Sequence, residues 1–79
     1  MVYPKLKAVK PKDNFYLLLE FDNGEKKEYD FKPNLSHSYY KALSNPLLFN
    51  SVSVNDGEIG WLTGQDFCPH TLYEESVTI

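Results

Sequence analysis

The residues with the greatest chemical potential lie close together near the end of the chain, in the run WLTGQDFCPHTLYEES (61–76). This run holds the single cysteine, Cys68, between Asp66 and His70, and the second histidine, His37, lies far from it in the sequence. A thiolate, an imidazole and a carboxylate are all suitable zinc ligands. Structural zinc sites, however, take pairs of Cys or His from two segments, and the second segment here offers only His37. We therefore predict no metal site and no cofactor.

The same residues make a poor nucleophilic pair. A catalytic cysteine needs a histidine within hydrogen-bond reach, and that histidine needs a third group to orient it. His70 is separated from Cys68 by Pro69, which is expected to start a helix, so the two side chains need not converge. Cys68 is expected to be partly buried and inert. The sequence also has no nucleophile elbow and no phosphate-binding loop, and we predict no catalytic residues and no enzymatic activity.

Three residues remain as binding candidates: Asp66, His70 and Asp30. Asp66 precedes Pro69 closely, and a short acid there is expected to accept backbone N–H bonds at the start of the last helix, in an Asx-type turn. The same two roles, structural and binding, are considered for Asp30, which follows Tyr29. A structural role is the main interpretation of both acids, and a binding role is the alternative. If either acid lines a pocket, a basic or polar ligand group is expected there.

The length and composition indicate one small globular protein. Its 79 residues are expected to form a single compact α+β domain over 1–79, with a thin core carried largely by aromatic residues, which make up 15% of the chain. A single cysteine allows no intramolecular disulfide, and the start of the chain, MVYPKLKAVK, contains no apolar stretch long enough for a signal peptide or a membrane span. We expect a cytoplasmic protein without membrane association.

Charge is distributed unevenly along the chain, whose net charge is −3. All eight basic residues are lysines at or before Lys41. The chain after Lys41 contains five acids and no lysine or arginine. Readers of nucleic acid usually present a basic face, and arginine is the residue that contacts guanine and phosphate through two parallel bonds. Because arginine is absent, direct binding to nucleic acid is not favoured.

A first β-hairpin is predicted in FYLLLEFDNGEKKEYDF (15–31). A two-residue turn at Asn23-Gly24 would set leucines opposite acids, whereas a three-residue loop over 22–24, with Gly24 left-handed, joins the apolar side chains on one face. The longer loop is therefore preferred. It pairs Leu17 with Tyr29, Phe15 with Phe31, and Glu20 with Lys26.

A second hairpin, in SVSVNDGEIGWL (51–62), favours the shorter turn. A two-residue turn at Asp56 and Gly57 brings the large apolar residues onto one face, and a three-residue loop would not. The pairs are Val54 with Ile59 and Val52 with Trp61. Trp61 is therefore interpreted as a core anchor and not as an exposed platform for a ligand.

Three further elements complete the prediction. KLKAVK (5–10) is expected to be an edge strand with Leu6 and Ala8 facing inward, Lys5 and Lys7 facing outward, and Pro11 ending it. NLSHSYYKALSNP (34–46) is expected to hold a short helix, with Ser36 as its N-cap and Asn45-Pro46 as its end. PHTLYEE (69–75) is expected to form a brief helix. Pro69 occupies its first position, and Leu72 and Tyr73 pack back onto the sheet.

Together these runs resemble a known family. FDNGEKKEYDF (21–31), NPLLFNSVSV (45–54) and IGWLTGQDFCPHTLYEES (59–76) are similar to the small bacterial family catalogued as domain of unknown function 2442. The most specific positions are Asn23-Gly24, Tyr29-Asp30, Trp61, Gly64, Asp66, Pro69, Leu72, Tyr73 and Ser76. The resemblance implies a compact α+β fold and no established activity. Similar domains occur alone, or before a helix-turn-helix segment, or encoded beside another small protein as in toxin–antitoxin pairs.

The sequence thus predicts an α+β protein: a small, mostly antiparallel sheet of about five strands (strand, hairpin, helix, hairpin) with a short C-terminal helix. The favoured function is a non-enzymatic protein-interaction module, the partner of another small protein in a toxin–antitoxin-like or regulatory pair, an idea that comes mostly from the resemblance. A homodimer formed by pairing of strand edges is a further expectation. The alternatives are a regulator associated with nucleic acid and a domain that binds a small ligand.

Overall fold

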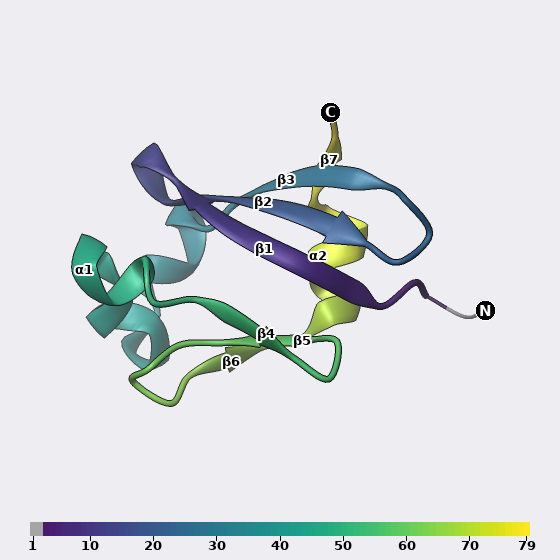
Figure 1. The fold of residues 1–79 in the computed structure, drawn as a ribbon. Helices are drawn as coiled ribbons and strands as arrows, with labels where there is room; N and C mark the ends of the chain where they lie inside the picture. The colour runs from purple at the N-terminus through teal and green to yellow at the C-terminus, as the bar shows by residue number, and fades with distance from the viewer. Residues whose placement is uncertain (1–2) are drawn as a thin grey trace.

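Two antiparallel sheets form the structure of residues 3–79, the part of the chain that the computed structural model describes (Figure 1). The first sheet has the strand order β1-β2-β3-β7, and the second has the order β4-β5-β6. The strands are β1 (Leu6–Lys12), β2 (Tyr16–Phe21), β3 (Lys26–Asp30), β4 (Ser53–Asn55), β5 (Glu58–Gly60), β6 (Asp66–Phe67) and β7 (Val77–Thr78). The α-helices are α1 (Pro46–Phe49) and α2 (Pro69–Glu75), and the 3₁₀ segments are η1 (Asp13–Phe15), η2 (Lys32–Ser36) and η3 (Ser38–Ser44).

The predicted fold class is confirmed: the structure is α+β, with antiparallel strands and a short C-terminal helix. The described residues contain seven strands in two sheets, where about five strands in one sheet were expected. The two additional strands, β6 and β7, are only two residues each. Strands this short carry too little alternation to be read from a sequence.

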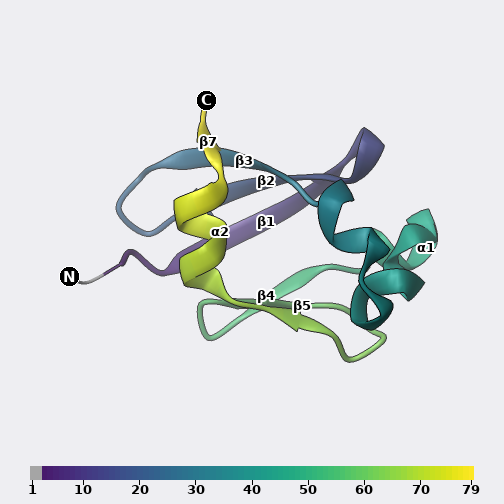
Figure 2. The same cartoon turned by 180° about the vertical axis from the view of Figure 1, so that it is seen from behind.

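The sheets form two layers, with α2 across one end of the space between them and η2, η3 and α1 at the other end (Figures 1 and 2). Buried side chains from both layers join in one core, and aromatic rings dominate it. Phe31 is fully buried, and its ring centroid lies 5.2 to 5.8 Å from those of Tyr40, Phe49, Trp61 and Phe67. Aromatic contacts at such separations stabilise a core beyond the area that they bury.

Both hairpins have the predicted register. In the first, Leu17 pairs with Tyr29 and Glu20 with Lys26, and Gly24 has a φ of +90°. In the second, Val54 pairs with Ile59 around a turn whose two central residues, Asp56 and Gly57, have φ values of 51° and 80°. Two positive φ angles are the requirement of a type I′ turn. Trp61, only 6% exposed, donates its indole N–H to the carbonyl oxygen of Phe49 at 3.0 Å, so its prediction as a core anchor is confirmed.

The prediction for the first strand is correct at its start and wrong further along. Leu6 is buried and β1 is an edge strand, but a register shift between Leu6 and Ala8 turns Ala8 outward and Val9 toward the core. Burying valine removes more apolar surface from water than burying alanine, which favours the bulged register. The strand also continues through Pro11, which pairs with Leu17, because proline costs no ladder bond on an edge strand.

The expected helix over 34–46 is replaced by two 3₁₀ segments, η2 and η3. Ser36 does not cap a helix. Its hydroxyl donates to the carbonyl oxygen of Pro33 at 3.1 Å, and the Ser44 hydroxyl does the same to Lys41 at 2.8 Å. Serines that bond to carbonyls three residues earlier compete with α-helical backbone bonds. Asn45, expected to end a helix, instead caps α1 by accepting the N–H of Leu47 at 3.1 Å.

The C-terminal helix α2 begins at Pro69 and ends at Glu75, as predicted. Leu72 is fully buried, and the ring of Tyr73 meets that of Phe21 edge to face at 5.1 Å. Both residues therefore pack the helix onto the inner side of the four-stranded sheet, as expected from the sequence.

The other side of this sheet is the outer face, and no element of residues 3–79 lies over it (Figures 1 and 2). Side chains alternate along each strand, so the residues of the outer face follow from the register. They form three rows across the sheet: Lys12, Tyr16 and Asp30; then Lys10, Leu18, Glu28 and Val77; then Ala8, Glu20, Lys26 and Ile79.

Candidate functional site

Asp66 lies in β6 and is exposed. Its carboxylate accepts the hydroxyl of Tyr39 at 3.4 Å, and its backbone oxygen accepts the hydroxyl of Tyr40 at 2.9 Å. The predicted Asx-type turn at the start of α2 is wrong, because Cys68 occupies the N-cap position and Asp66 lies in a paired strand two residues earlier. Asp66 therefore ties β6 to η3 and does not direct α2.

Cys68 is exposed, which corrects the expectation that it is partly buried. The backbone N–H groups of Thr71 and His70 lower the pKa of the Cys68 thiol from its ordinary value. The exposed ring of His70 stacks on that of Tyr3, with centroids 4.6 Å apart. His37 stands between η2 and η3, and residues 3–79 contain no group of three or more His, Cys, Asp or Glu placed to hold a metal ion.

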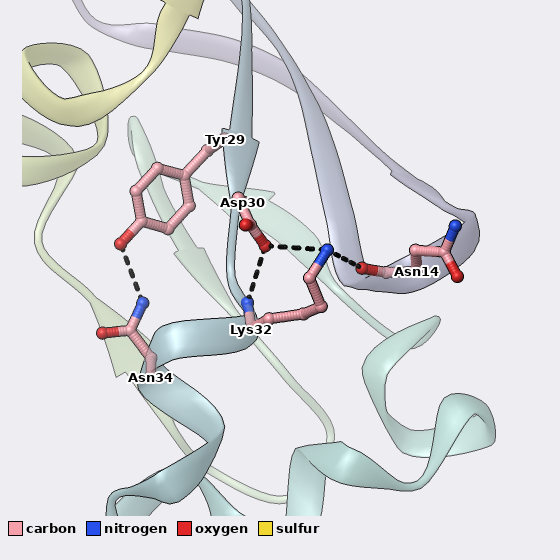
Figure 3. A network of polar contacts seen from close by, with 5 residues as sticks. All are labelled: Asn14, Tyr29, Asp30, Lys32 and Asn34. Atoms are coloured by element: carbon pink, nitrogen blue, oxygen red, sulfur yellow. Dashed lines mark hydrogen bonds and ion pairs between the residues drawn. The ribbon is translucent and has the colours of Figure 1, made fainter.

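Asp30, at the end of β3, has the backbone role that was expected of Asp66. Its Oδ1 accepts the N–H of Lys32 at 3.0 Å and lies 3.4 Å from the Lys32 ammonium (Figure 3). That ammonium also donates to the carbonyl oxygen of Asn14 at 3.3 Å. A carboxylate that accepts a backbone N–H two residues further along forms an Asx turn, which here directs the chain from β3 into η2.

The ammonium group of Lys32 also lies over an aromatic ring, 4.3 Å from the centroid of Tyr16. Asn14, whose carbonyl it contacts, has a φ of 62°, a left-handed conformation that asparagine tolerates better than most residues. The site around Asp30 thus holds an ammonium group between a carboxylate, a carbonyl oxygen and a ring. These are the groups that recognise lysine and arginine side chains.

Tyr29 lies beside Asp30, with its side chain on the inner side of the strand. Its hydroxyl accepts the amide N–H of Asn34 at 2.7 Å (Figure 3) and donates to the carboxylate of Glu75 at 3.4 Å. Burial is the main cause that raises the pKa of Tyr29, and the negative charge of Glu75 adds to it. The phenol therefore stays neutral and links η2 to the end of α2.

These residues line one groove of about 490 Å³. Its lining residues are Tyr16, Glu28, Tyr29, Asp30, Pro33, Asn34, Glu75 and Val77. We call it the Asp30 groove. Three of its side chains are carboxylates. Glu28 is paired with Lys12 at 2.8 Å and Asp30 with Lys32, while Glu75 makes, within residues 3–79, only its long contact with Tyr29. Two phenols, one amide and the apolar side chains of Pro33 and Val77 complete the lining.

A second groove, of about 310 Å³, lies on the outer face beside it. Ala8, Leu18 and Ile79 supply its apolar surface, and Lys10, Glu20 and Lys26 supply its charges, with Val9 and Leu19 beneath. We call it the Leu18 groove. Since Val77 and Ile79 lie in neighbouring rows of the outer face, the two grooves adjoin along β7.

Residues 6–78 match the model of the family described as "Protein of unknown function (DUF2442)". The chain belongs to this family. The match begins at the first residue of β1 and ends at the last residue of β7, so it takes in every strand of both sheets. Among curated proteins and among solved structures, none is significantly similar to the chain. None of the helices in residues 3–79 has the length and apolar character that a membrane-spanning segment needs.

Of the three candidates named from the sequence of this DUF2442 protein, only Asp30 lines either groove. Asp66 and His70 lie on β6 and α2, and no hydrogen bond, ion pair or ring contact within residues 3–79 joins either of them to Asp30 or to each other. Sequence reasoning missed the groove residues Tyr16, Glu28 and Glu75. The hairpin register could have found the first two, because it places Tyr16 beside Asp30 and Glu28 on the same face. The position of Glu75 in the groove depends on how α2 packs against the sheet, which the register does not give.

Proposed function

We propose that this protein is a non-enzymatic interaction module that binds another small protein through the outer face of its four-stranded sheet, with a basic side chain of the partner in the Asp30 groove. The observation that carries the proposal is the Asp30 groove itself. The carboxylates of Asp30, Glu28 and Glu75 line it together with the ring of Tyr16, where the open outer face of the sheet meets η2 and the end of α2.

The basic character of the partner is argued from the ammonium groups already held at this groove. Lys32 contacts the carboxylate of Asp30 and the ring of Tyr16, and Lys12 contacts Glu28. The geometry therefore suits an alkylammonium or guanidinium group, and Glu75 is the carboxylate left to receive one. A basic or polar ligand group was the expectation for a pocket lined by Asp30, and a cation is its basic form.

The protein nature of the partner is argued from the adjoining Leu18 groove. A small cationic ligand would use the Asp30 groove alone. A polypeptide segment could fill both grooves, with an apolar residue against Leu18 and Ile79 and a basic residue near Glu75. We place this interaction in the cytoplasm, where an exposed thiol such as Cys68 stays reduced.

The test is affinity capture from the organism that makes the protein, with the captured partner then purified and its binding measured. Asp30→Asn combined with Glu75→Gln should weaken that binding by about tenfold or more, and added salt should weaken the wild-type complex. Asp56→Asn is the matched control, because this acid lies in the type I′ turn of the other sheet and asparagine keeps the positive φ. Equal binding by the groove variant and the control would overturn the proposal.

A further inference from the structure

The two edges of the four-stranded sheet differ in their protection. The β1 edge carries a bulge, a proline at position 11 and several lysines, which are the features that prevent edge-to-edge pairing. The β7 edge has none of these. It consists of Val77 and Thr78, followed by Ile79, and both Val77 and Ile79 are 68% exposed.

The backbone of β7 has hydrogen-bonding capacity left at this edge. The N–H of Ile79 donates to the carbonyl oxygen of Lys26 at 3.2 Å, which places Ile79 in a hydrogen-bonded position against β3. Along an antiparallel strand, successive residues direct their N–H and C=O groups to opposite sides. Thr78 therefore directs its N–H and its C=O away from β3, toward the open edge.

The charges beside β7 are opposite at its two ends. Next to Ile79 lies Lys26, whose side chain makes no ion pair or hydrogen bond within residues 3–79. Next to Val77 lies Glu75, whose one polar contact in the described part of the chain is the long one with Tyr29. An antiparallel strand that carries the same pattern would meet each of these charges with its opposite.

From these observations we propose that two copies of the chain associate through β7, antiparallel, about a two-fold axis at Thr78. The two Thr78 residues exchange their N–H and C=O groups, and Val77 of each copy lies opposite Ile79 of the other. The lysine end of one edge then faces the acidic end of its partner. This self-complementary pattern is what a two-fold interface requires, and it favours a second copy over an unrelated strand.

The association joins two four-stranded sheets into one continuous sheet and stops there, because the protected β1 edges lie at both ends. The four exposed apolar side chains of the paired β7 strands meet on the outer face. An interface made of one short strand from each copy is at the weak end of specific association, so the dimer dissociates on dilution. The inference does not rest on the proposed function, since it concerns the purified protein alone.

The experiment is sedimentation equilibrium of the purified protein over roughly 10 to 500 µM, a range in which mass action reveals weak dimers. We expect a reversible monomer–dimer equilibrium. Val77→Lys and Ile79→Lys should each weaken dimerisation by roughly tenfold or more, because lysine on an edge strand opposes pairing. Leu62→Lys is the matched control, since Leu62 is also apolar and 86% exposed but lies in the turn after β5.

A charge exchange tests the register. Lys26→Glu alone places like charges together and should weaken the dimer, and adding Glu75→Lys should restore it. Thermal unfolding of each variant confirms that it remains folded. A protein that stays monomeric at the highest concentration would overturn the proposal. So would a dimer that Val77→Lys leaves intact, or one that Leu62→Lys weakens equally. Since no partner protein is present, these results are independent of the affinity capture described above.

Discussion

The ammonium group of Lys27 lies 2.5 Å from the backbone carbonyl oxygen of Tyr73 and 4.1 Å from the centroid of its ring. Like Tyr29, Lys27 points from β3 to the core side of the sheet, and it is only 8% exposed. A cation at the C-terminal end of a helix stabilises the carbonyl groups left without partners there. This contact therefore fastens α2 to the sheet that carries the Asp30 groove.

Replacing Lys27 should show how much its contact with Tyr73 contributes to stability, apart from the effect of removing a surface charge. Lys27→Met removes the bond to Tyr73 but keeps the aliphatic part of the side chain, and we expect the free energy of unfolding to fall by about 1 to 3 kcal/mol. Lys26→Met is the control, because Lys26 is its neighbour on the outer face and should change stability by less than about 0.5 kcal/mol. Urea denaturation measures both. Equal effects would show that the Tyr73 contact contributes nothing.

The hydrogen bond between Tyr73 and Glu25 predicts a loss of stability in acid. The Tyr73 hydroxyl donates to Glu25 at 2.6 Å, and this bond is the main cause that lowers the pKa of Glu25, with Asn23 second. A lowered pKa in the folded state gives stability that is present above the unfolded value of 4.5 and is lost as the pH falls below it. Tyr73→Phe should flatten this part of the stability curve, measured by denaturation between roughly pH 6 and pH 3. An unchanged slope would contradict the assignment.

At alkaline pH, ionisation of Tyr29 should lower the stability of the fold as the pH rises. Burial raises the pKa of Tyr29 above its ordinary value of 10.0, so the folded state holds this proton more tightly than the unfolded chain does. The resulting stability is complete below pH 10 and is lost as the pH rises from there through the folded-state pKa. Tyr29→Phe should reduce the loss, which unfolding measurements between roughly pH 9 and pH 11.5 would detect. Tyr16→Phe, whose ring stays in place beneath Lys32, is a control expected to leave the loss in place.

The local parts of this fold could be predicted from sequence, and the parts made by docking could not. Turn chemistry and apolar alternation determine both hairpin registers, and Pro69 marks the start of α2, since each depends on residues close together in the chain. The bulge before Ala8 buries Val9 in place of Ala8. This preference depends on the core that the rest of the chain forms, so local sequence does not predict it. The same holds for Cys68 and Glu75, whose exposure and neighbours depend on where α2 packs.

The thiol of Cys68 should react more readily than its sequence context suggested. Because backbone N–H groups of Thr71 and His70 lower its pKa, a larger fraction is thiolate near neutral pH than in the unfolded chain. We expect alkylation by iodoacetamide to be faster in the native protein than in denaturant at the same pH, and its pH midpoint to lie below the ordinary value. Slower alkylation of the native protein would instead support the expected inert cysteine.

Asp30 combines two roles that a pair of substitutions can separate. Asp30→Asn keeps an oxygen that accepts the N–H of Lys32 but removes the negative charge, whereas Asp30→Ala removes both. We expect Asp30→Ala to lower the free energy of unfolding by about 1 kcal/mol and Asp30→Asn to lower it much less, because the Asx turn survives in asparagine. Binding of a basic partner should fall in both variants, since it depends on the charge. If Asp30→Asn kept full affinity for that partner while Asp30→Ala lost it, the acid would act only by shaping the turn into η2, and recognition of a cation would have to rest on Glu75 and Tyr16.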